Sequence, residues 1–213
     1  MRRILLTGGA PQVGVDAVRY FSGRATGGTS VALARRLRER GLEVDLLLGE
    51  LASPQEPALR FRERGDLDDG VRTWIGRHPD GVVVMAAAVN DYTVARVESV
   101  RGGIPQIHAP GSKVPSQADE VRVVLRPAAK LIEQLRPWGL AGPIVAFKYE
   151  AADTVLASAE ALRRRTGAML VVANSLDAEI QALVDARGVE HCHERRILLD
   201  RLGERLLALA LGR

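Results

Sequence analysis

The feature that most constrains the fold is an apolar run that begins at Val82 and stops abruptly in polar residues. It reads Val82-Val83-Val84-Met85, continues through three alanines and Val89, and ends in Asn90-Asp91-Tyr92. Consecutive branched apolar residues are typical of a central strand in a parallel sheet that is covered on both faces. Ligands of open parallel sheets bind at the carboxyl ends of the strands. The run therefore predicts a buried strand over residues 82–88 and a polar site beside Asp91.

Length and composition favour one α/β domain that spans residues 1–213. Hydrophobic residues make up 46% of the chain, which is enough for a sizeable core. No apolar run reaches the roughly 20 residues that a membrane-spanning helix needs, and the first residues resemble a strand rather than a secretion signal. The single cysteine, Cys192, excludes an internal disulfide and indicates a reducing compartment. We therefore expect a cytoplasmic protein with no membrane partner.

The charge pattern argues against a nucleic-acid partner. The net charge is +4 and the isoelectric point is about 9.7, but the arginines are spread along predicted helices, without a basic stripe interleaved with aromatic residues. Only three of the thirty basic residues are lysines, namely Lys113, Lys130 and Lys148. Where arginine is the usual cation, a lysine in a loop indicates a need for a compact, flexible ammonium group. Lys130, in contrast, is interpreted as an ordinary charge on a helix face.

Strand and helix patterns alternate along the chain. Strands are predicted at residues 3–7, 43–48, 58–61, 82–88, 121–125, 143–148 and 168–173. Helices are predicted at residues 27–40, 66–77 with Asp66 as N-cap, 127–136, 153–165 with Asp153 as N-cap, and 198–211. Residues 180–193 are typical of a hairpin, and residues 93–120, broken by glycines and prolines, are predicted to be a long lid or binding loop. This order predicts a doubly wound, Rossmann-like, mostly parallel sheet with a C-terminal β-hairpin and helix.

The first glycine-rich turn, Thr7-Gly8-Gly9, is open to three interpretations. It follows a strand as a nucleotide-binding turn does, and its backbone donors suit a phosphate. The next glycine is Gly14, so the spacing matches neither G-x-G-x-x-G nor a P-loop. A short-chain dehydrogenase would also need a Tyr-x-x-x-Lys pair, which neither Tyr92 nor Tyr149 forms. A glycine turn without any ligand is the third interpretation.

Six short motifs together resemble those of the phosphopantothenate–cysteine ligases, also called phosphopantothenoylcysteine synthetases. They are Thr7-Gly8-Gly9 with Asp16-Ala17-Val18-Arg19-Tyr20, Ala25-Thr26-Gly27, Ala87-Ala88-Val89-Asn90-Asp91-Tyr92, Ser112-Lys113-Val114, Ala146-Phe147-Lys148-Tyr149-Glu150 and Val172-Ala173-Asn174. Each motif is weakly specific alone, and the one that ends in Asp91-Tyr92 is the most specific. The set follows the family's order over nearly the whole chain.

The resemblance implies a two-step ligation of a carboxylate to an amine. A nucleoside triphosphate, CTP or ATP with Mg²⁺, activates the carboxylate as an acyl-nucleotidylate, and an amine such as cysteine then displaces the nucleotide. The implied catalytic residues are Lys113, on a mobile loop, and Asp91. The implied nucleotide-binding residues are Gly8, Gly9, Ala87, Ala88, Phe147, Lys148 and Asn174, and the implied substrate-binding residues are Asp16, Arg19, Arg24, Gly27 and Asn90. The resemblance also implies a homodimer in which the lid loop crosses to the partner, and we expect no metal site built from protein side chains alone.

The chain departs from the family pattern at two places. Gly23 stands where the family carries an asparagine that is thought to serve the second half-reaction, and the segment between Asp91 and Lys113 is longer than in the family. The nucleotide side is thus better preserved than the acceptor side. Three alternatives stay open: the family's own reaction, a ligase for a different acid or amine, and a non-catalytic nucleotide-binding or regulatory protein. His191 and His193 are interpreted as a hairpin surface rather than a metal site.

Overall fold

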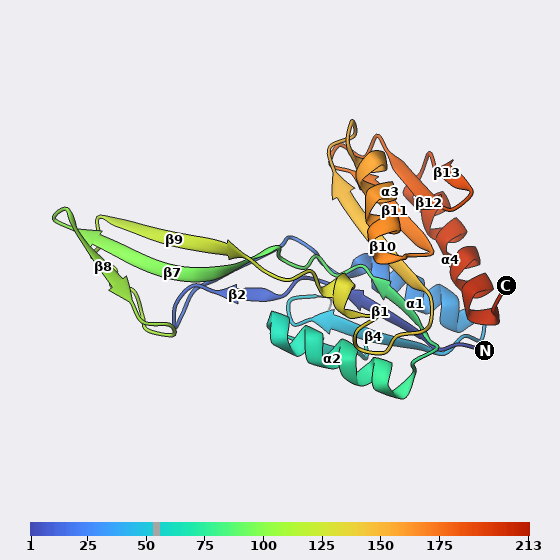
Figure 1. The fold of residues 1–213 in the computed structure, drawn as a ribbon, viewed down its shortest axis with the longest axis horizontal. Coiled ribbons are helices and arrows are strands. Elements are labelled where there is room, and N and C mark those ends of the chain that lie inside the picture. The colour runs from blue at the N-terminus through green and yellow to red at the C-terminus, as the bar shows by residue number, and fades with distance from the viewer. Residues whose placement is uncertain (53–55) are drawn as a thin grey trace.

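The central feature of the computed structural model, which describes residues 1–52 and 56–213, is an eight-stranded sheet (Figure 1). Its strands are β1 (Ile4–Gly8), β4 (Val44–Gly49), β5 (Leu59–Phe61), β6 (Val82–Met85), β10 (Ile144–Glu150), β11 (Leu170–Ser175), β12 (Gln181–Asp185) and β13 (Gly188–His191). Their order across the sheet is β13-β12-β11-β10-β6-β1-β4-β5. The first six of these strands in chain order are parallel, whereas β12 and β13 are antiparallel.

This order confirms the predicted doubly wound fold with a C-terminal hairpin. The six parallel strands are arranged as in a dinucleotide-binding sheet, and the chain reverses its direction of winding between β1 and β6. Ligands of such sheets bind at the carboxyl ends of the strands that flank this reversal. The first four residues of the apolar run form β6, which is central and fully buried, so the strand predicted over residues 82–88 ends three residues earlier, before the alanines. The sequence prediction of a buried strand that ends at a site is therefore consistent with the topology.

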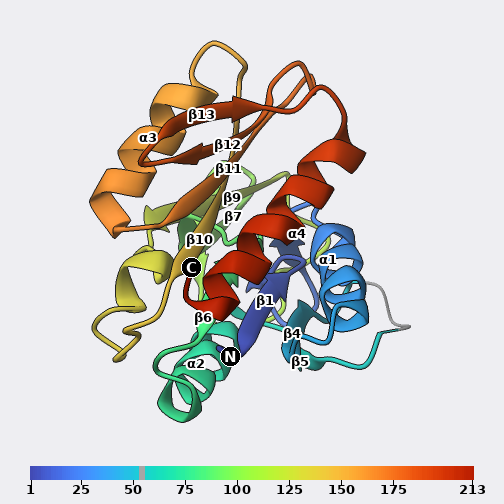
Figure 2. The same ribbon diagram turned by 90° about the vertical axis from the view of Figure 1, so that its right-hand side faces the viewer.

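Helices cover both faces of the sheet, and the sheet separates two apolar cores. The helices α1 (Gly28–Glu39) and α4 (Arg195–Leu211) pack on one face, and α2 (Arg64–Arg77) and α3 (Val155–Thr166) pack on the other (Figure 2). Along β6, Val82 and Val84 enter the α1/α4 core, whereas Val83 and Met85 enter the α2/α3 core. Because successive strand residues point to opposite faces, every residue of this strand needs an apolar side chain.

Two predicted helix caps are wrong by one to three residues. The N-cap of α2 is Glu63, and Asp66 is the third helical residue. The Asp66 carboxylate accepts a hydrogen bond from the backbone N–H of Glu63 at 2.9 Å, which closes a capping box. Likewise α3 is preceded by Thr154 rather than by Asp153. In both cases the acidic residue is near the helix start, as expected from the helix dipole, but is not the cap itself.

The predicted loop over residues 93–120 is wrong, because most of it is sheet. Strands β7 (Tyr92–Arg101), β8 (Ile104–His108) and β9 (Glu120–Pro127) form an antiparallel sheet in the order β8-β7-β9, an arm that extends away from the body (Figure 1). Gly102 and Gly103, with φ of +57° and +79°, form the two-residue turn between β7 and β8. Two consecutive positive φ angles are the geometry of a tight hairpin turn and favour glycine. The sequence interpretation took these glycines as breaks, whereas they join two strands.

The helix predicted over residues 127–136 is also wrong. Strand β9 runs to Pro127, which pairs with Tyr92 at the base of the arm. Only a short 3₁₀ helix, η1 (Leu131–Gln134), follows. A second unpredicted element is the small hairpin of β2 (Gln12–Gly14) and β3 (Tyr20–Ser22), whose first strand contacts β7 beside the arm.

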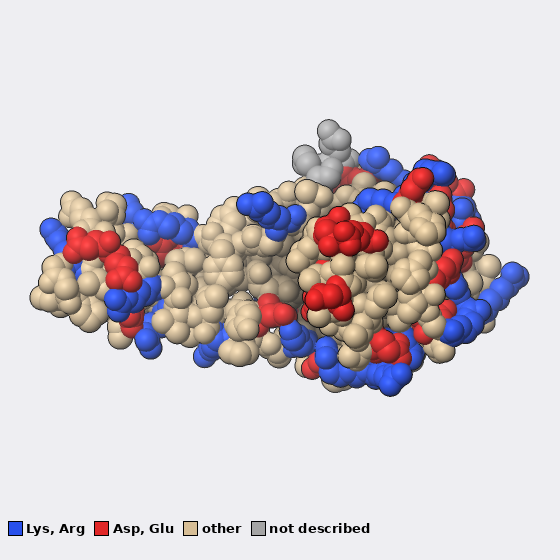
Figure 3. All heavy atoms as spheres, turned by 90° about the horizontal axis from the view of Figure 1, so that it is seen from above, with Lys and Arg blue, Asp and Glu red and all other residues tan. Residues whose placement is uncertain are grey.

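The surface carries charges of both signs. Figure 3 shows basic side chains interspersed with acidic ones over the arm and the body on the face it presents. Within the described residues, none of the helices is long and apolar enough to cross a membrane.

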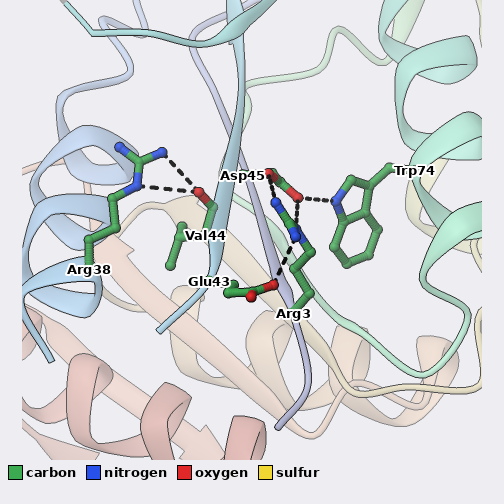
Figure 4. A network of polar contacts seen from close by, with 6 residues as sticks. All are labelled: Arg3, Arg38, Glu43, Val44, Asp45 and Trp74. Atoms are coloured by element: carbon green, nitrogen blue, oxygen red, sulfur yellow. Dashed lines mark hydrogen bonds and ion pairs between the residues drawn. The ribbon is translucent and has the colours of Figure 1, made fainter. Parts of the chain in front are cut away.

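A polar network holds the amino-terminal edge of the sheet, opposite the site (Figure 4). Arg3 donates to both carboxylate oxygens of Asp45, at 2.6 and 3.0 Å, and the indole N–H of Trp74 donates to the same carboxylate at 2.7 Å. Burial raises the pKa of the Asp45 carboxyl, but the hydrogen bonds from Arg3 and Trp74 outweigh it and hold the pKa below its ordinary value. One carboxylate on β4 therefore joins the residue before β1 to α2.

Asp45→Ala is expected to lower the free energy of unfolding by about 1–3 kcal/mol, because it leaves the buried Trp74 N–H without an acceptor and removes two hydrogen bonds of the Arg3 guanidinium, which keeps the one to Glu43. The folded-state pKa of Asp45 is depressed, so its contribution is present above its unfolded pKa of about 4 and is lost as the pH falls through the folded value. Denaturant titrations at pH 7 and pH 2.5 measure this. An equal difference between the two proteins at both pH values would contradict the assignment.

Candidate active site

The ends of β1 and β6 are joined directly at the point where the sheet reverses its winding. The Ala87 backbone N–H donates to Thr7 Oγ1 at 3.2 Å, and the Ala88 N–H donates to the Gly9 carbonyl at 2.8 Å. Gly9 has φ +78°, and a Cβ there would lie 3.0 Å from the backbone nitrogen of Gly49. This glycine is thus required by close backbone approach. The predicted residues Gly8, Gly9, Ala87 and Ala88 therefore lie near one another at the carboxyl edge of the sheet, but the two glycines are buried.

A cavity of about 280 Å³ lies at this edge on the α2/α3 face, and we call it the cationic cavity. Its walls come from the end of β6, from the residues around η1, from the end of β10 and from α3. The lining residues are Arg64, Met85, Ala87, Ala88, Val89, Asp91, Ala129, Lys130, Leu131, Ile132, Phe147, Lys148, Tyr149, Leu162 and Arg165. It brings together five residues predicted from the sequence, namely Ala87, Ala88, Asp91, Phe147 and Lys148. Motifs about sixty residues apart in the chain therefore meet at one place.

Ion pairs organise the charged groups of the cationic cavity. Lys130 Nζ lies 2.5 Å from Asp91 Oδ1, and Lys148 forms an ion pair with Glu150. The hydrogen bond from Lys148, followed by one from Ser158, lowers the pKa of the Glu150 carboxyl. The interpretation of Lys130 as a helix-face charge is wrong, because it precedes η1 and faces Asp91. The one sequence feature that pointed to a role for Lys130 is the rarity of lysine in this chain.

A second cavity, of about 410 Å³, lies on the α1/α4 face at the N-terminus of α1. Its lining residues are Arg24, Ala25, Thr26, Gly27, Gly28, Thr29, Ser30, Ala32, Ala86, Arg195 and Leu199. Gly27, the N-cap of α1, has φ +72°, which favours glycine. A helix N-terminus with Arg24 and Arg195 beside it suits an anion. The predicted residues Arg24 and Gly27 therefore lie together, but not in the cationic cavity.

Phe147 packs partly toward the α1/α4 face, and Asn174 has a buried side-chain oxygen without a partner among the described residues. Phe147 lines the cationic cavity, but its side chain packs against the α1/α4 core, as expected when neighbouring strand residues alternate faces. Asn174 Oδ1 is buried without a hydrogen-bond partner in the described part of the chain, and so is Gln181 Oε1, on the residue that pairs with Asn174 across β11 and β12. The site role of Asn174 stays a prediction.

Asp16, Arg19 and Lys113 lie together beside the arm, away from the cationic cavity. The Asp16 carboxylate, only 1% exposed, accepts hydrogen bonds from the backbone of Val18, Arg19 and Val114 and from the Arg19 guanidinium. These bonds, the one from Val18 foremost, lower the pKa of Asp16. Lys113 is exposed and adjoins Val114. Lys113 is not among the described residues that line either cavity. Its predicted catalytic role therefore requires an arrangement in which its side chain comes close to one of these cavities.

Two further positions adjoin the site. Asn90 donates from its side-chain amide to the Pro11 carbonyl at 3.3 Å, and it lines a smaller cavity at the base of the arm. A Cβ at Gly23 would lie 3.3 Å from Ala10 Cβ and 3.5 Å from Ala88 Cβ. Gly23 thus faces the carboxyl end of β6, and a small side chain there would fit with slight adjustment.

The donor set contains no preassembled metal centre: no cluster of three or more His, Cys, Asp or Glu side chains placed to bind a metal occurs in residues 1–52 and 56–213. Asp91 is the single carboxylate among the described residues that line the cationic cavity. One carboxylate suits a Mg²⁺ ion that arrives with phosphates, since Mg²⁺ takes most of its ligands there from phosphate and water.

Comparison with known proteins reveals relatives over most of the chain. The family described as the DNA/pantothenate metabolism flavoprotein C-terminal domain matches residues 1–195. The coenzyme A biosynthesis bifunctional protein CoaBC of Mycolicibacterium smegmatis is 32% identical over 187 residues, which are 82% of this chain and 42% of that protein. The chain thus spans less than half the length of this relative.

Solved structures share the fold. The DNA/pantothenate metabolism flavoprotein from Streptococcus pneumoniae superposes with a TM-score of 0.83 at 19% identity, covering 98% of this chain and 99% of that one. The H337A mutant of Cab2, in complex with phosphopantothenate-cysteine, superposes with a TM-score of 0.80 at 15% identity, covering 99% of this chain and 87% of that one.

Proposed function

Because the chain belongs to the DNA/pantothenate metabolism flavoprotein C-terminal domain family, we propose that it is a nucleotide-dependent carboxylate–amine ligase of coenzyme A biosynthesis. The preferred reaction joins phosphopantothenate to cysteine. The observation that carries the proposal is the cationic cavity at the carboxyl edge, where the Ala87–Asp91 and Phe147–Lys148 motifs converge. The names of CoaBC and of the Cab2 complex support the same assignment.

The proposed reaction has two balanced steps. A carboxylate oxygen attacks the α-phosphorus of the nucleotide, the bond from that phosphorus to the bridging oxygen breaks, and pyrophosphate leaves. The amine nitrogen then attacks the acyl carbon, a C–N bond forms, the acyl C–O bond breaks, the nucleoside monophosphate leaves, and the amine proton passes to solvent. Asp91 accepts a hydrogen bond from the ribose, and cationic side chains neutralise the charge that develops on the phosphates.

The proposal includes the setting of the reaction. CTP or ATP would enter as its Mg²⁺ complex, and Asp91, the single carboxylate among the described residues that line the cationic cavity, would help to hold the metal ion. The protein acts as a cytoplasmic homodimer, and Lys113, which lies beside the arm, reaches the cavity of the partner. Gly8, Gly9 and Gly27 allow the backbone to approach phosphates closely, while Arg19 and Arg24 attract anionic groups of the acid substrate.

The test is a reconstitution with the purified chain, Mg²⁺, phosphopantothenate, cysteine and either CTP or ATP. We expect pyrophosphate release with the acid alone, and the amide product by mass spectrometry only when cysteine is added. If neither nucleotide releases pyrophosphate, the proposal of a phosphopantothenate ligase fails.

Gly23 supports a second candidate, a non-catalytic nucleotide-binding protein or a ligase for another acid or amine. The position faces Ala88 but carries no side chain to orient an acyl group or an amine. Nucleotide binding without pyrophosphate release from any of a panel of candidate carboxylates favours the non-catalytic candidate. Pyrophosphate release without amide formation from cysteine favours another amine.

Gly23→Asn is expected to speed the amine step about tenfold, since one added hydrogen bond contributes roughly 1.4 kcal/mol. The measurement is single-turnover amide formation after the acyl-nucleotide has accumulated. Gly76→Asn is the control for the same exchange away from the site, because Gly76 lies on α2 and a Cβ there meets open space, whereas a Cβ at Gly23 contacts Ala10 and Ala88. An unchanged rate in Gly23→Asn would remove this position from the acceptor side.

A further inference from the structure

We propose that Lys130 binds a phosphate oxygen of the substrates in the cationic cavity. The inference rests on the proposed function for the chemistry of the ligand, a phosphate of the nucleotide or of the acid. It assigns to Lys130 a direct binding role that the sequence motifs do not contain.

The backbone around Lys130 is held at the site from several sides. The Ala128 N–H donates to the Asp91 carbonyl at 2.8 Å, and the Arg64 guanidinium donates to the Ala129 carbonyl at 2.9 Å. Leu131, the next residue, is 3% exposed and packs in the α2/α3 core. Lys130 is therefore fixed relative to Asp91 by its neighbours, which reduces the conformational entropy lost when a ligand binds.

The Lys130 side chain itself has free capacity toward the cavity. Its ammonium carries three donors, and the ion pair with Asp91 Oδ1 at 2.5 Å occupies one of them. The side chain is 45% exposed, so the other donors reach ligand without displacing core residues. Asp91, the residue directly before β7, orients this ammonium.

The charge balance of the cavity favours an anion. Among the described lining residues, the cationic side chains are Arg64, Lys130, Lys148 and Arg165, against the single carboxylate of Asp91. Arg64 and Arg165 pair outside the cavity with Asp68 and Glu133, and Lys148 pairs with Glu150. Lys130 is the cation whose acidic partner also lines the cavity, so a phosphate bound there meets the Lys130–Asp91 pair directly.

The test measures binding to the full chain by calorimetry, with inorganic tripolyphosphate, CTP, ATP, phosphopantothenate and unphosphorylated pantothenate as separate probes. Lys130→Met should weaken binding of a phosphate-bearing probe about 30-fold, as expected for the loss of one charged hydrogen bond. Lys130→Arg should recover binding to within about tenfold of the unaltered protein, since the charge is kept but the geometry changes. Arg77→Met, an exposed cation at the far end of α2, is the control and should change binding less than twofold.

The probes separate the two sources of phosphate. A loss for tripolyphosphate and the nucleotides places a nucleotide phosphate on Lys130, whereas a loss for phosphopantothenate but not for pantothenate places the acid's phosphate there. Both results support the inference. If Lys130→Met keeps its melting temperature and binds every probe as the unaltered protein does, or if the unaltered protein binds none, the inference is overturned. Tripolyphosphate binding that depends on Lys130, without pyrophosphate release in the reconstitution, would instead defeat the proposed ligase function alone.

Discussion

Lys113→Gln is expected to slow acyl-nucleotide formation about a thousandfold, because a cation that meets the charge developing at the α-phosphate acts mainly in the transition state. Lys113 is exposed on the segment that links β8 to β9. The backbone N–H of the next residue, Val114, donates to the Asp16 carboxylate between β2 and β3, so this segment is held beside the arm. The glutamine keeps a polar side chain, removes the charge and is one atom shorter.

The measurement is single-turnover formation of the acyl-nucleotide with saturating nucleotide and acid. Arg77→Gln removes one exposed positive charge from α2 and is the control for net charge. A rate for Lys113→Gln within threefold of the unaltered protein would exclude Lys113 from the first step.

Asp91→Asn is expected to lower kcat/KM for the nucleotide about a hundredfold, since it removes a charged acceptor for the ribose and the partner of Lys130 together. The matched control is Asp69→Asn, which neutralises an exposed carboxylate on α2 that pairs with Arg72. Steady-state pyrophosphate release over a range of nucleotide concentrations gives the ratio. If Asp91→Asn matches Asp69→Asn, the site at the end of β6 does not bind the nucleotide.

Mixing these two variants tests whether the arm works across a dimer. In a heterodimer of Asp91→Asn and Lys113→Gln, one site combines both substitutions and the other combines neither, if Lys113 serves the partner's cavity. Random two-fold pairing of equal amounts of the two chains should then restore about a quarter of the activity. If each chain instead uses its own Lys113, both sites of every dimer keep one substitution, and mixing restores nothing.

The parts of the fold that follow from local patterns were predictable. The apolar run at Val82 predicted a central strand because only a strand covered on both faces needs an apolar side chain at every position. The alternation of strands and helices predicted the doubly wound sheet, because the helices between parallel strands pack on both faces of the sheet. The arm was missed because Gly102 and Gly103 were interpreted as breaks, although two adjacent glycines also suit a hairpin turn. Which meaning holds depends on whether the flanking segments find strand partners, and those partners are distant in the chain.

The sequence by itself determined the chemistry available at the carboxyl edge: a small-residue strand end followed by Asp91, a glycine turn after the first strand, and only three lysines in a chain rich in arginine. These are properties of residue type and spacing, which need no knowledge of neighbours. Only the tertiary structure decided which charges meet. It placed Lys130 against Asp91, because ion pairs depend on distances of a few ångströms between segments that the strand order brings together. It also brought Val114, the residue after Lys113, to the Asp16 carboxylate.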